Sequence, residues 1–68
     1  MNNPYVAFIQ DVLITLHANI RDLKERRNFA DPEELTYIEA KLLAYNEILS
    51  ILRSSADDTG IDRKEVGL

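Results

Sequence analysis

Cysteine is absent from this 68-residue sequence, histidine occurs once and glycine twice. Without cysteine the chain can form no disulfide bond and offers no thiolate ligand to a metal. The two glycines, Gly60 and Gly67, form no phosphate-binding loop. We therefore expect no cofactor, no metal site and no catalytic site, and we do not expect an enzyme.

Residues that could carry chemistry lack the neighbours that chemistry requires. Ile14 and Ile20 stand three residues before and after His17, so the Glu-x-x-His pair of di-metal helical bundles is missing. We expect His17 to lie partly buried at the edge of an apolar helix face. Tyr5 and Tyr45 fall on a predicted helix–helix seam, where we expect their rings to pack rather than to bind a ligand.

Long apolar runs are also missing. The longest uncharged run, residues 1–10, is far shorter than the ~20 apolar residues that a membrane-spanning helix needs. No basic segment precedes an apolar run and a small-residue cleavage site, which is the pattern of a signal peptide. These features predict a cytoplasmic protein without membrane association.

Acidic side chains outnumber basic ones by 12 to 8, which gives a net charge of −4. This excess repels phosphate, so nucleic acid is not the expected partner. One basic cluster could still contact phosphate or an acidic protein, although cations at that place also compensate the dipole at a helix C-terminus. The cluster consists of Arg21, Lys24, Arg26 and Arg27.

Helical periodicity is what the sequence does contain. Asn3 can cap the first backbone N–H groups of a helix, and Pro4 loses no hydrogen bond at the first helical position. Apolar residues then recur at helical spacing as far as Leu23, and Asn28 can end the helix in the left-handed conformation. We expect a first helix over residues 4–27.

A second helix is predicted over residues 32–56. Asp31 provides the cap, Pro32 takes the first helical position, and Glu34 is placed for a capping box. The apolar residues that follow alternate in steps of three and four, which is the spacing of a coiled-coil seam. This seam consists of Leu35, Ile38, Leu42, Tyr45, Leu49, Leu52 and Ala56.

The connection between the two helices, residues 28–30, is so short that the helices must be antiparallel neighbours in a hairpin. Folding at this connection brings Arg26 and Arg27 toward Glu33 and Glu34. It also predicts three sets of apolar contacts: Leu23 with Leu35 and Ile38, Leu16 with Leu42 and Tyr45, and Ile9 with Leu49 and Leu52.

Residues 57–68 depart from the helical pattern. Two consecutive aspartates oppose the dipole at the C-terminal end of the second helix, and Gly60 is a suitable stop. We expect residues 1–56 to form one helical domain. Residues 57–68 are expected to be a mobile tail, or a single helical turn if Ile61, Val66 and Leu68 find a groove.

Each predicted helix carries a second apolar row that the other helix of the hairpin cannot cover. An exposed apolar patch on a small protein usually marks an interface. We expect two hairpins to pack these rows together as a homodimeric four-helix bundle, with a different helical protein as the other possible occupant. The expected interface residues are Phe8, Leu13, Ile14, Tyr37, Ala44, Ile48 and Ile51.

The surplus apolar rows favour a non-enzymatic protein–protein interaction module, such as an adaptor, an assembly factor or a regulator with an unidentified protein partner. The other hypothesis is a nucleic-acid-associated regulator that uses the basic residues between Arg21 and Arg27. The two hypotheses place the functional surface on different residues, apolar in the first case and basic in the second.

Overall fold

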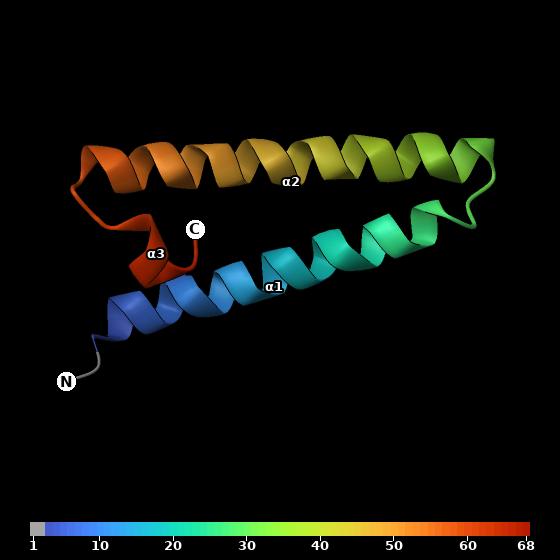
Figure 1. Ribbon diagram of the computed structural model, residues 1–68. Helices are drawn as coiled ribbons and strands as arrows, with labels where there is room; N and C mark the ends of the chain where they lie inside the picture. Colours follow the sequence, from blue (N-terminus) through green and yellow to red (C-terminus); the bar gives the residue numbers. More distant parts are fainter. Residues whose placement is uncertain (1–2) are drawn as a thin grey trace.

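Two long antiparallel helices and one short helix make up the fold (Figure 1). The computed structural model describes residues 3–68. Helix α1 spans Pro4–Arg27, α2 spans Pro32–Asp58 and α3 spans Arg63–Val66. The described part of the chain contains no strand, so the prediction of an all-α helical hairpin is confirmed.

Both long helices begin at the predicted caps. The Asn3 side chain accepts a hydrogen bond from the Tyr5 backbone N–H at 2.9 Å, and the Asp31 side chain accepts one from the Glu34 backbone N–H at 2.8 Å. The Glu34 carboxylate pairs across the turn with Arg26 at 3.0 Å, as predicted. No ion pair joins Arg27 to Glu33 within residues 3–68.

The end of α1 differs from the prediction. Asn28 has φ −68° and ψ −18°, which is right-handed, so it does not end the helix in the left-handed conformation. The last turn instead tightens, because the backbone N–H of Asn28 donates to the Glu25 carbonyl and that of Phe29 to the Arg26 carbonyl. These bonds run from residue i to residue i−3, as in a 3₁₀ helix, and they satisfy carbonyls in the last turn of α1 without a residue at positive φ.

Helix α2 continues to Asp58, two residues beyond its predicted end, and Gly60 then stops it as predicted. The backbone N–H of Ile61 donates to the Ala56 carbonyl at 2.8 Å, and that of Gly60 donates to the Asp57 carbonyl at 3.2 Å. This pair of bonds is a Schellman motif, which requires the positive φ of 72° found at Gly60. The motif reverses the chain and directs the following residues back toward α1.

The two long helices lie closer together at the turn than at the open end, where α3 lies between them (Figure 1). The core is correspondingly divided into two clusters. Leu23, Ile38 and Leu42 form the cluster near the turn. The cluster at the open end takes one buried residue from each helix, namely Leu13, Leu49 and Val66.

This arrangement corrects one sequence-based expectation and decides between the two alternatives left open for another. Leu13 was expected on the exposed second row, but its side chain is only 1% exposed and lies in the open-end cluster. Residues 57–68 were expected to form a mobile tail or a single turn, and the structure shows the single turn: α3 is docked, with Val66 only 5% exposed. Leu13 is buried because Val66 covers it, a contact between segments at opposite ends of the sequence.

The predicted apolar contacts are partly confirmed. Leu23 shares a cluster with Ile38, and Ile9 packs with Leu52 against the open-end cluster. Leu16 also packs against the open-end cluster, whereas it was expected beside Leu42 and Tyr45. The splay of the helices accounts for this shift, because Leu16 reaches the region that α3 fills.

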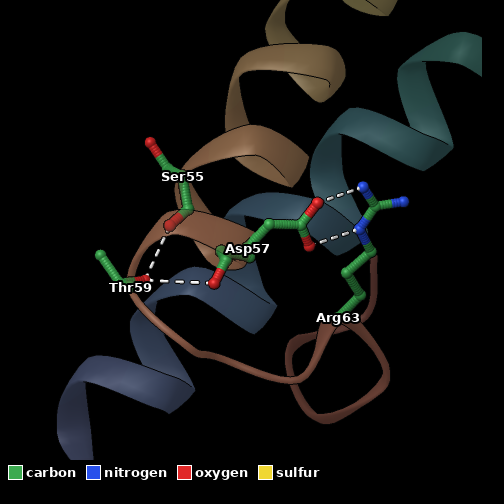
Figure 2. A network of polar contacts seen from close by, with 5 residues as sticks. Ser55, Asp57, Thr59 and Arg63 are labelled. Carbon is green, nitrogen blue, oxygen red and sulfur yellow. Dashed lines mark hydrogen bonds and ion pairs between the residues drawn. The ribbon is translucent and has the colours of Figure 1, made fainter.

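A polar link at the end of α2 helps to hold the returning chain (Figure 2). The Arg63 guanidinium donates to both carboxylate oxygens of Asp57, from Nε at 3.0 Å and from Nη2 at 2.6 Å. The Thr59 hydroxyl donates to the backbone carbonyls of Ser55 and Ala56. Arg63 therefore compensates an aspartate that would otherwise oppose the dipole of α2.

The link between Asp57 and Arg63 predicts a local pH dependence. Hydrogen bonds from the Arg63 guanidinium, together with its charge, lower the pKa of Asp57 below its ordinary value of 3.8. Because the folded-state pKa is depressed, the stabilising contribution is present above about pH 4 and is lost as the pH falls through the folded-state pKa. NMR titration of the Asp57 carboxyl carbon should show a midpoint below 3.8. In Arg63→Gln the midpoint should return toward the ordinary value, and an unchanged midpoint in this variant would contradict the assignment.

Candidate interaction surface

An apolar stripe runs along the outside of α2. Ile48 is 42% exposed and Ile51 is 65% exposed, and Tyr37 and Ala44 are also exposed. These residues follow one another in steps of seven, four and three, so they share one side of the helix. Ser55 continues the same row toward the open end.

A second apolar stripe lies at the beginning of α1. It consists of Tyr5 and Phe8, which are about one turn apart and largely exposed. Tyr5 was expected on the seam between the helices, so this finding corrects the prediction. An apolar groove of about 410 Å³ at the open end has Tyr5 on one wall and Ser55 on the other, so the stripes of α1 and α2 border the same face. We call this face the apolar face: Tyr5, Phe8, Tyr37, Ala44, Ile48 and Ile51.

Two residues predicted for the interface lie elsewhere. Leu13 is buried in the core. Ile14 is 68% exposed, but it follows Phe8 by six residues and is therefore turned about 120° away from it around the helix. Ile14 lines a different depression, beside His17 and Lys64. Helical periodicity alone could not separate these residues, because the whole first half of α1 is apolar.

The sequence-based prediction did not identify two exposed apolar residues. Phe29, in the connection between the long helices, is 90% exposed. Leu43, on α2, is 62% exposed and follows neither apolar row. It precedes Ile48 by five residues and is turned about 140° away from it, so it lies off the apolar face.

The protein exposes more surface than its size requires. Its accessible area is 5358 Å², whereas a compact monomer of this mass would expose about 4,400 Å². The excess is close to the ~800 Å² that each partner buries in a standard protein–protein interface. The shape explains the excess, because the molecule measures 47 × 22 × 14 Å and its smallest dimension is little more than one helix diameter.

Polar side chains mark the part of the apolar face nearest the turn. The Lys41 ammonium lies 5.0 Å from the centre of the Tyr37 ring, within cation–π range. Tyr45 is half-buried on the seam as predicted, and its hydroxyl accepts a hydrogen bond from the Asn19 side chain at 3.1 Å. The face therefore has an aromatic and cationic end near the turn and a hollow end beside α3.

The basic cluster does not form one patch. Arg21 and Lys24 border a shallow depression on one side of α1, together with His17. Arg26 lies on the other side, in a depression bordered by Lys41 and Tyr45, and its charge is paired with Glu34. Arg27 lines neither depression. His17 is exposed rather than partly buried, which corrects the prediction for this residue.

Within residues 3–68, no group of three or more histidine, aspartate or glutamate side chains is placed to hold a metal ion. In the same part of the chain, neither long helix has a stretch that is apolar enough to cross a membrane.

Comparison with known proteins finds no matching family model, no similar curated protein and no similar solved structure.

Proposed function

We propose that this protein is a small protein–protein interaction module, an adaptor, assembly factor or regulator that acts by binding rather than by catalysis. Its apolar face is the binding surface, and a second copy of the chain is the partner that covers it. The product is a homodimeric four-helix bundle. The observation that carries the proposal is the run of exposed Tyr37, Ile48 and Ile51 on a chain with about 1,000 Å² of surplus surface.

The layer structure supports this proposal. A hairpin is a single layer of helices, and domains are normally built from at least two packed layers around one core. A second hairpin laid on the apolar face would complete the arrangement found in four-helix bundles. Ala44 lies near the middle of the stripe, where a small side chain lets two helices approach closely.

The energetics also favour a partner on this face. Full burial of one Ile or Phe side chain contributes about 1.5–3 kcal/mol. Ile48, Ile51 and Phe8 are each exposed, so their burial in both copies would contribute on the scale of the ~5–15 kcal/mol stability of a whole domain. Dimerisation would therefore be strongly coupled to folding.

The proposal is tested by light scattering over a dilution series with a matched pair of variants, Ile48→Glu and Leu43→Glu. Both place the same charge on an exposed apolar position of α2, but only Ile48 lies on the apolar face. The wild type and Leu43→Glu should have twice the mass of one chain. Ile48→Glu should have the mass of one chain at concentrations where the wild type is dimeric, because dimerisation would bury its carboxylate without a partner.

Circular dichroism of the same samples shows whether Ile48→Glu remains helical once it is monomeric. A folded wild-type monomer across the whole dilution series would overturn the homodimer. A dimer that persists in Ile48→Glu but is lost in Leu43→Glu would place the interface on the opposite side of α2.

A further inference from the structure

We infer that the two copies pack antiparallel, with the turn of one hairpin over the open end of the other and the Tyr37 ring of each copy seated in the apolar groove of its partner. The inference rests on the proposed homodimer and defines its arrangement. Two hairpins related by a two-fold axis in the plane of the apolar face have two choices, turn over turn or turn over open end. The positions of the groove and of the bulky side chains on the apolar face distinguish between these two arrangements.

The hollow part of the face is at the open end. The groove of about 410 Å³ there is formed by the beginning of α1, the end of α2 and the docked C-terminal segment, and its lining is mainly apolar. In a turn-over-turn dimer the two grooves would face each other and leave a large unfilled space. Voids of this kind are costly in a packed interface.

The bulky part of the same face is near the turn. Tyr37 is exposed there, and the Lys41 ammonium lies 5.0 Å from the centre of its ring. In a turn-over-open-end dimer each Tyr37 faces the groove of the other copy. One large aromatic side chain then occupies each hollow, and the symmetry makes both ends of the interface equivalent.

The spacing along α2 matches this arrangement. In it, α2 of one copy runs antiparallel over α2 of the other, and a two-fold axis level with Asn46 sets Tyr37 opposite Ser55, a lining residue of the groove. The same axis sets Ala44 opposite Ile48 of the second copy. At these two positions a large side chain thus faces a small one, which favours close packing of the two helices, and the same axis sets Ile51 opposite Lys41 of the second copy.

Charge favours the same arrangement. Of the described residues that line the groove, Glu65 alone carries a charged side chain. Seating Tyr37 in the groove brings the adjacent Lys41 to this end of the partner. The cation then lies toward the end of the partner that carries Glu65, whereas a turn-over-turn dimer would set the two Glu65 side chains at the same end.

The absence of cysteine allows the arrangement to be measured with single spin labels. Phe29→Cys places a label at the exposed turn, and Asn46→Cys places one level with the axis. Double electron–electron resonance should give a Phe29 label separation comparable with the 47 Å length of the hairpin. Asn46 is turned about 160° from Ile48, so its labels lie on the outer sides of the dimer but at its middle, and their separation should be shorter than 47 Å, as in any face-to-face dimer.

The outcomes separate this inference from the proposed function. A Phe29 label separation no greater than the 22 Å width of the hairpin would overturn the antiparallel arrangement and leave the dimer standing. No dipolar coupling from either label would overturn the dimer and the inference together.

The seating of the ring has its own variants. Tyr37→Ala should weaken self-association at least tenfold, because it empties both grooves, while Tyr37→Phe keeps the ring and should stay near the wild type. Self-association of Tyr37→Ala within twofold of the wild type would show that the groove is not filled by this residue.

Discussion

Replacing Leu13 by alanine is expected to lower the free energy of unfolding by about 2–5 kcal/mol. Leu13 is 1% exposed and belongs to the only cluster among residues 3–68 to which all three helices contribute a buried residue. Its removal leaves a cavity beneath both Leu49 and Val66, so the loss includes apolar transfer and unfilled space. Urea denaturation followed by circular dichroism measures the effect, at a fixed chain concentration because dimerisation would add to stability.

Ile14→Ala is the matched control for this experiment. The two residues are adjacent in α1 and have similar volume, but the Ile14 side chain is 68% exposed. Truncation at an exposed site should change stability by no more than about 0.5 kcal/mol. Equal effects of the two variants would contradict the burial of Leu13 under α3.

The second large effect is expected from Val66→Asp, which should detach α3 from the long helices. Val66 is 5% exposed, and a carboxylate at its position could not be buried without a partner. The free energy of unfolding should fall by the ~1.5–3 kcal/mol that burial of one valine side chain contributes. Detachment of α3 should also expose Leu13 and Leu49 to water. Hydrogen exchange reports the change, because the Leu68 backbone N–H donates to the Arg63 carbonyl at 2.8 Å in the docked segment.

The control for Val66→Asp is Ile61→Asp, in the same segment. Ile61 is about half exposed, so an aspartate there can remain in water while α3 stays docked. The Leu68 amide should keep its protection in Ile61→Asp and lose it in Val66→Asp. Protection that persists in Val66→Asp would mean that the polar contacts hold the segment without the valine.

Those polar contacts are weak by comparison. The Gln10 side chain donates to the Glu65 carbonyl at 2.7 Å, and Asp57 pairs with Arg63, but both contacts are exposed. Exposed ion pairs contribute little, and a helix as short as α3 has almost no stability alone. The docking of α3 therefore depends chiefly on Val66, with Leu68 half-buried beside it.

The docked segment also shapes the candidate interaction surface. Val66 and Leu68 line the groove together with Tyr5 and Ser55. If α3 detached, its part of the lining would be lost and the groove would open into the space between the long helices. Val66→Asp is therefore expected to alter the open end of the apolar face as well as the stability of the chain.

The sequence by itself determined the two long helices, their direction and their starts. Caps and periodicity act over three or four residues, so Asn3 and Asp31 could be identified as caps without knowledge of the rest of the chain. The connection of residues 28–30 is so short that the two long helices could only pack antiparallel. The exposed stripe from Tyr37 to Ile51 followed from the same periodicity, because the seam residues of α2 were unambiguous.

Only the tertiary structure decided how far the helices splay and what fills the open end. Leu13 and Val66 are far apart in the sequence, and no local pattern records that one will cover the other. On α1 the apolar residues extend around so much of the helix that its rotation about its own axis is not fixed by their spacing. Packing against both α2 and α3 sets that rotation, and it buries Leu13 while leaving Tyr5 exposed.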